Sequence, residues 1–109
     1  MDDNLITEIN RKQKDLDVAV KQLRTSGSDY AQAEHDYKVL LRTEALKLRD
    51  QGMAVGMIDK VIYGIEEVAK ARLERDKFLT IYEANKECIN SLKLQIRIID
   101  AQISREWGR

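Results

Sequence analysis

The sequence predicts an all-α protein built as a long antiparallel helical hairpin or coiled coil. Three observations support this class. The 109 residues contain no proline and only five glycines. Charged residues make up 35% and hydrophobic residues 43%, a mixture typical of long helices and coiled coils. Finally, apolar residues recur at spacings of three and four along most of the chain. The length favours a single helical domain over residues 1–109.

Residues 3–24 and 29–51 are expected to form the first two helices. Apolar residues from Ile6 to Leu23 recur at helical spacing, and Gln13 interrupts this stripe. Gln13 is interpreted either as a residue tolerated at a partly wet seam or as a polar contact that sets the helix register. Residues 25–29 have the sequence Thr-Ser-Gly-Ser-Asp. Gly27 suits the end of one helix, and Ser28 or Asp29 suits the N-cap of the next. They predict a turn, with one kinked helix running through them as the alternative.

Residues 52–64 form the most apolar and least repetitive segment, and they predict a hairpin tip with a short helix at about 55–63. One interpretation is a hydrophobic cap that seals the end of the hairpin. The other is a docking surface for a protein partner, because exposed apolar residues at a tip mark binding sites and methionines adapt to irregular surfaces. The candidate contact residues are Met53, Val55, Met57, Ile58 and Tyr63.

Residues 65–107 predict the longest helix, and its C-terminal half carries the clearest apolar stripe. Apolar residues also lie off the stripe, namely Cys88, Leu94, Ile98 and Ala101, and the resulting arc is wider than a two-helix seam can bury. We therefore expect a homo-oligomer, most simply a dimer with a four-helix arrangement. The expected interface consists of Ile89, Leu92, Leu94, Ile96, Ile98, Ile99 and Ile103. Asn85 lies on the stripe and is, with Gln13, a candidate for setting the register.

Charge and motif content exclude several classes of function. Nineteen basic residues balance nineteen acidic ones, without the segregation that a general phosphate-binding surface needs. There is no signal-like N-terminus and no apolar run long enough to cross a membrane, and one cysteine fits a reducing compartment, so we expect a soluble, cytoplasmic protein. No catalytic, metal-binding or cofactor-binding motif is present, and neither the single histidine, His35, nor Cys88 has a partner at ligand spacing. We therefore expect a non-enzyme without a cofactor.

Three segments carry a resemblance to a known group of proteins: residues 37–53, YKVLLRTEALKLRDQGM; residues 61–64, VIYG; and residues 94–107, LQIRIIDAQISREW. Over residues 37–108 the chain resembles small early proteins of phages and prophages in Gram-positive bacteria. Such proteins tend to be encoded among recombination and replication genes. The resemblance implies a setting in the bacterial host cytoplasm rather than an activity, and it transfers no functional residue.

These observations favour a non-enzymatic interaction protein, expected to be a phage-encoded adaptor or inhibitor of a host, defence or DNA-processing protein. One alternative is a small DNA-binding protein, because residues 46–72 resemble a degenerate helix-turn-helix. Against it, Glu66 and Glu67 would place carboxylates at the start of the recognition helix, where phosphates are contacted. The other alternative is a structural assembly scaffold.

Overall fold

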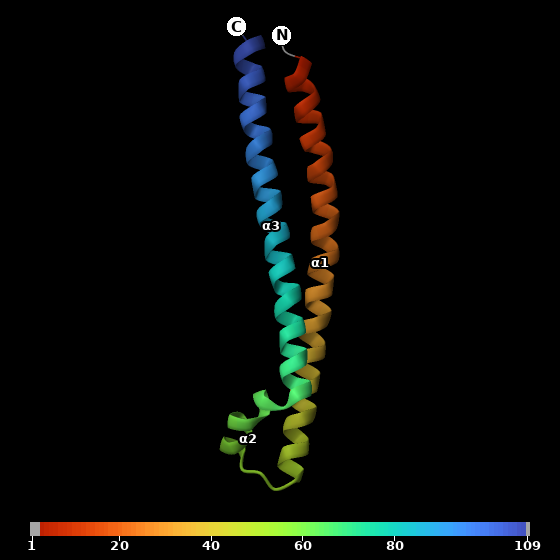
Figure 1. Ribbon diagram of the computed structural model, residues 1–109, viewed down its shortest axis with the longest axis vertical. Helices are drawn as coiled ribbons and strands as arrows, with labels where there is room; N and C mark the ends of the chain where they lie inside the picture. Colours follow the sequence, from red (N-terminus) through yellow and green to blue (C-terminus); the bar gives the residue numbers. More distant parts are fainter. Residues whose placement is uncertain (1–2, 109) are drawn as a thin grey trace. The chain divides into compact units, whose positions relative to one another are not determined.

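The computed structural model describes residues 3–108, and nearly all of them are helical (Figure 1). α1 spans Asp3–Asp50, α2 spans Val55–Val61, the 3-10 helix η1 spans Ile62–Gly64, and α3 spans Glu66–Trp107. The chain runs through α1, turns at α2 and η1, and returns through α3, and this range contains no strand. The predicted all-α helical hairpin is confirmed.

α1 is one continuous helix of 48 residues, so the turn predicted at residues 25–29 is wrong, and the helix runs through them as in the stated alternative. A glycine inside a helix costs only about 1 kcal/mol relative to alanine, which is too little to end a helix that packs on both sides of it. Ser26 is buried at 4% exposure, and the Thr25 hydroxyl donates a hydrogen bond to the Lys21 carbonyl. The polar side chains that suggested a cap are therefore accommodated within the helix.

α1 ends within one residue of the position that the sequence predicted, and Gly52 explains why. Gly52 has a φ of 87°, the left-handed conformation that glycine adopts most readily. Its amide donates to the Arg49 carbonyl at 2.9 Å, and the Met53 amide donates to the Leu48 carbonyl at 3.1 Å. This is the Schellman motif, and the two residues at its usual apolar positions, Leu48 and Met53, both pack against the same core cluster.

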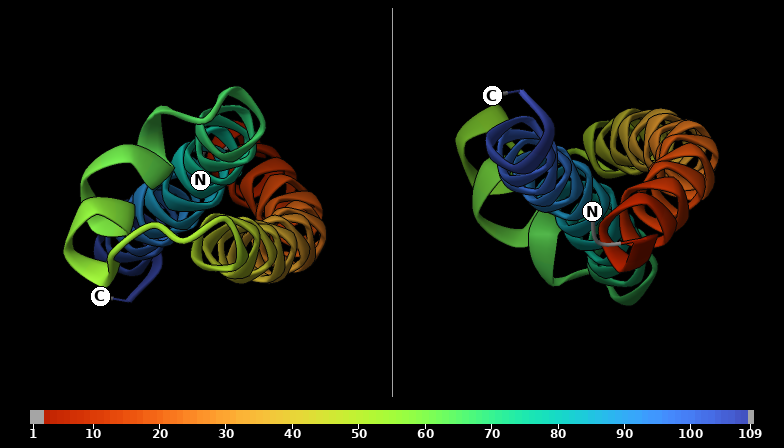
Figure 2. Two further views of the ribbon diagram at one scale, coloured as in Figure 1. Left: turned by 90° about the horizontal axis from the view of Figure 1, so that it is seen from below. Right: turned by 90° about the horizontal axis from the view of Figure 1, so that it is seen from above.

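The chain divides into two compact units, and α1 and α3 each contribute to both. Unit 1 comprises residues 1–25 and 82–109, and unit 2 comprises residues 26–81. In unit 1 the two helices run antiparallel, with Ala19, Ile89 and Leu92 buried between them. In unit 2, α2 and η1 lie beside the pair formed by α1 and α3 rather than between them (Figure 2).

Both long helices bury residues at the alternating three- and four-residue spacing of a coiled coil. In unit 1 the covered positions include Leu5, Ile9, Lys12, Leu16, Ala19 and Leu23 of α1 and Tyr82, Asn85, Ile89, Leu92, Ile96, Ile99 and Ile103 of α3. In unit 2 they include Ser26, Tyr30, Ala33, Tyr37, Leu40 and Glu44 of α1 and Val68, Ala71, Arg75 and Phe78 of α3. The seam is thus made within one chain.

The register at the start of α1 differs from the expectation by one residue. Ile6 is 39% exposed and Gln13 is exposed, whereas Leu5 and Lys12 take the covered positions. A lysine fits such a position because its methylene stem can lie along the seam while the amine reaches water. Gln13 therefore lies outside the covered positions of the seam. Across residues 3–108, no helix is both long and apolar enough to span a bilayer.

Candidate interaction site

The end of unit 2 is held together by a small core in which α2 and η1 pack on the two long helices. Tyr37, Ile58, Ile62 and Val68 are buried there, and Val68 is fully covered. Side chains from the end of α1, such as Leu41 and Ala45, surround this cluster. The apolar tip therefore acts in part as the hydrophobic cap that the sequence suggested.

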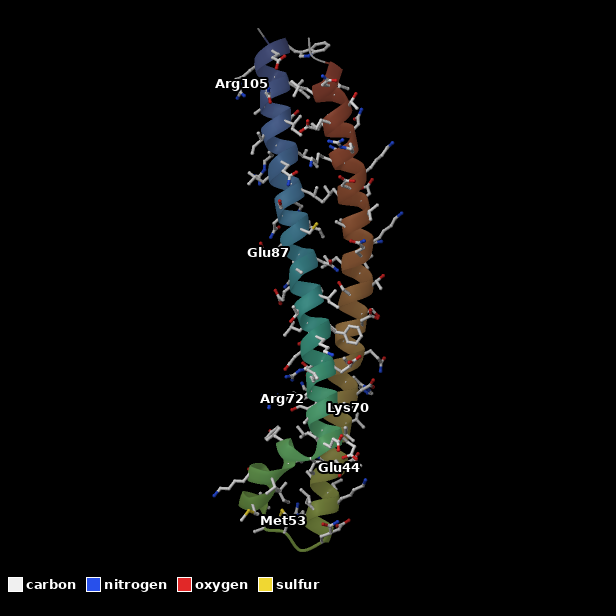
Figure 3. The ribbon with its side chains drawn as sticks, in the orientation of Figure 1. Glu44, Met53, Lys70, Arg72, Glu87 and Arg105 are labelled. Carbon is white, nitrogen blue, oxygen red and sulfur yellow. The ribbon has the colours of Figure 1, made fainter. Side chains whose placement is uncertain are left out.

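The structure separates the five predicted contact residues into two groups. Ile58 is only 6% exposed and belongs to the core, and Met53 is half-buried against it (Figure 3 labels Met53). Ile58 lies four positions before Ile62, and together they anchor one face of this segment on the core. Val55, Met57 and Tyr63 are 63%, 50% and 47% exposed and remain available to a partner.

A shallow hollow lies between α1 and the α2–η1 segment, and of the three exposed residues Tyr63 lines it. Its apolar lining is formed by Leu41, Ala45, Ile58 and Ile62 together with the ring of Tyr63. The Arg72 guanidinium carbon lies 5.5 Å from the centre of that ring, close enough for a cation–π contact that restrains the tyrosine.

The polar edge of the hollow carries more positive than negative charge. Lys38 and Arg42 of α1 line it, opposite the single carboxylate of Asp59. All three are exposed, and within residues 3–108 neither Lys38 nor Arg42 forms an ion pair. Sequence reasoning missed both residues because each sits on a helix face that looked like an ordinary charged surface.

A polar cluster around Arg75 lies in the seam of unit 2, also unforeseen. The Arg75 guanidinium carbon lies 4.7 Å from the centre of the Tyr37 ring, and its nitrogens contact Glu34 at 3.4 Å and Asp76 at 2.8 Å. The bond to Asp76 is the main cause that raises the pKa of Arg75. Tyr30 donates a hydrogen bond to Glu34 at 3.1 Å, which raises the pKa of its phenol. Every group is paired, which suits a structural role.

The two polar residues proposed to set the register have different environments. Gln13 is exposed, but Asn85 is half-buried and its amide donates to the Gln22 carbonyl at 3.4 Å. Asn85 thus makes a polar contact across the seam of unit 1. Such a contact favours the alignment that pairs the amide, and Asn85 stays a predicted register-setting residue.

The predicted oligomer interface also divides into two groups. Ile89, Leu92 and Ile99 are buried at 7%, 8% and 6% exposure, and Ile96 and Ile103 are half-buried. These five lie on the seam that α1 of the same chain covers, so little of their surface is left for a second copy. Leu94 and Ile98 remain 53% and 57% exposed.

Other sequence candidates occupy ordinary surface positions. The segment that resembles a helix-turn-helix forms the end of α1, α2 and the start of α3, with Glu66 and Glu67 exposed in the first turn of α3. His35 and Cys88 are exposed. In the described part of the chain, no three His, Cys, Asp or Glu residues are grouped to hold a metal ion.

Comparison with known proteins adds no relative: no family model, no curated protein and no solved structure matches the chain.

Proposed function

We propose that this chain is a non-enzymatic protein–protein interaction protein that binds its partner at the tip of unit 2. The observation that carries the proposal is the exposure of Val55, Met57 and Tyr63 on a short segment whose other face is anchored by Ile58 and Ile62. Burial of such side chains by a partner is favourable, at about 25 cal/mol for each Å² of apolar surface removed from water.

The charge at the hollow specifies the kind of partner. Lys38 and Arg42 lie beside the apolar lining, and their two positive charges outnumber the single negative charge of Asp59. A complementary partner is an amphipathic helix that carries carboxylates next to its apolar side chains, since helices of this type bind apolar grooves. The resemblance to early phage proteins adds a setting to the proposal: an adaptor or inhibitor of a host, defence or DNA-processing protein in a bacterial cytoplasm.

The test compares the partners that three versions of the full chain capture from a bacterial host lysate. The tip variant is Val55→Asp with Met57→Asp, and Ile58 is left intact because its replacement would disturb the core. Val18→Asp is the matched control, because Val18 is 53% exposed and lies in unit 1. We expect one partner to be retained by the wild type and the control and weakened roughly tenfold or more in the tip variant.

Equal capture by all three versions, with unchanged helix content, would contradict a role for the tip. The charge argument has a separate readout. Lys38→Glu with Arg42→Glu should also weaken capture, and higher salt should weaken the wild-type complex. If neither the Lys38→Glu/Arg42→Glu substitutions nor higher salt weakens capture, the partner is not an acidic helix.

A further inference from the structure

The C-terminal half of α3 carries a second face with coiled-coil spacing, on the side turned away from the seam. Its residues alternate in steps of four and three: Glu87, Ser91, Leu94, Ile98, Ala101 and Arg105. All six are exposed. At 3.6 residues per turn they fall opposite the buried stripe of Ile89, Leu92 and Ile99. Figure 3 shows Glu87 and Arg105 on the side of α3 that faces away from α1 in unit 1.

We propose that this outer face of α3 pairs with the same face of a second copy of the chain, antiparallel, about a twofold axis beside residue 96. In this register Leu94 meets Ile98 of the second copy, and Ser91 meets its Ala101. Glu87 meets Arg105 of the second copy. The twofold axis repeats each contact, so that two ion pairs flank a centre of four large apolar side chains.

Charge complementarity favours a second copy of the chain as the partner of this face, and antiparallel pairing as its direction. A parallel pairing would set Glu87 against Glu87 and Arg105 against Arg105, whereas the antiparallel one sets opposite charges together at both ends. Glu87 has no ion-pair partner of its own among residues 3–108, so its carboxylate is available to a second copy.

The smaller residues of the face also suit burial. The Ser91 oxygen already accepts a hydrogen bond from the Gln95 amide at 2.9 Å, so covering it leaves no unsatisfied acceptor. Ala101, opposite it in the proposed register, has no polar side-chain atom to bury. Because this face lies in unit 1 and the proposed partner site in unit 2, either proposal can fail without the other.

Cysteine crosslinking tests the direction of pairing. Cys88 is first replaced by serine, and two separate variants then carry Ser91→Cys or Ala101→Cys. In the proposed register, residue 91 faces residue 101 of the second copy, but the two copies of residue 91 lie about 15 Å apart along the axis. That exceeds the reach of a disulfide. We expect mild oxidation to crosslink the mixture of both variants and neither variant alone, as read on a non-reducing gel.

Two further sets of variants test the contacts themselves by sedimentation of the full chain. Leu94→Glu with Ile98→Glu should abolish the dimer, and Leu73→Glu, at an equally exposed position of α3 in unit 2, should keep it. Glu87→Arg alone should weaken the dimer, and Glu87→Arg combined with Arg105→Glu should restore it. Crosslinking of the Ser91→Cys variant alone as fast as the mixture, or a wild type that sediments only as a monomer at the highest soluble concentration, would overturn the proposal.

Discussion

Polar residues placed at seam positions distinguish unit 2 from a purely apolar coiled coil. Arg75 occupies a covered position of α3, and its side chain is only 22% exposed. It is stable there because its guanidinium stacks on Tyr37 while contacting Glu34 and Asp76. A charged group in such a place costs desolvation, and these contacts offset that cost only while all of them persist.

Replacing Arg75 by alanine should therefore lower the free energy of unfolding by about 1–2 kcal/mol, because the cation–π contact and the ion pairs are lost together. Arg75→Lys keeps the charge but not the planar stacking surface, so it should recover only part of that loss. Urea unfolding followed by circular dichroism measures both values. A lysine variant as stable as the wild type would mean that charge alone, and not stacking, holds this residue.

At the scale of the elements, α1 shows how packing outweighs a local signal. The residues around Gly27 have the composition of a turn, but the helix continues through them because covered positions such as Ser26 and Tyr30 keep the seam spacing on both sides. Gly52 has no such support beyond it, and there the chain leaves the helix in a left-handed conformation. Packing of the neighbouring residues, rather than the glycine itself, therefore decides whether the helix ends.

Gly52 and Gly56 form a matched pair for testing this end of α1. A Cβ at either position would meet no atom within 4 Å, so alanine probes the backbone alone. Gly52→Ala should destabilise the protein by about 1–2 kcal/mol because of its positive φ. Gly56→Ala, in the first turn of α2, should stabilise it by about 0.5 kcal/mol through the unfolded chain. Thermal unfolding gives both signs, and equal shifts would contradict the role assigned to Gly52.

Much of this architecture could be predicted from the sequence because its signals are periodic. The helical class, the stop at Gly52 and the long return helix are indicated by apolar spacing and glycine placement. The register of α1 could not be predicted, since Leu5 and Ile6 are adjacent apolar residues and either could begin a stripe. Only contact with the facing helix selects Leu5 and Lys12 over Ile6 and Gln13.

For the molecule as a whole, the sequence identified which residues are apolar and lie on one helix face, but not which neighbour covers them. The apolar pattern of α3 predicts a single interface, although the seam within the chain takes five of its residues and leaves Leu94 and Ile98 outside. Likewise Ile58 could not be told from Met57 without knowing which face of α2 meets the core. Lys38 and Arg42 become candidate binding residues only because the structure places them at the edge of the hollow.

An intrachain seam has a consequence for how the protein folds. Since α1 of the same chain covers Ile89, Leu92 and Ile99, a single copy already buries its main stripe and needs no second chain to be helical. The pairing proposed for the outer face of α3 adds stability only at concentrations near or above its dissociation constant. At low enough concentration, the wild type and the Leu94→Glu/Ile98→Glu variant sediment alike because neither pairs. When the wild type is diluted further below that concentration, we expect its far-UV circular dichroism to stay strongly helical and its urea midpoint to stay unchanged. Loss of helix from the wild type over that range would show that folding depends on assembly, and that the seam within one chain is insufficient.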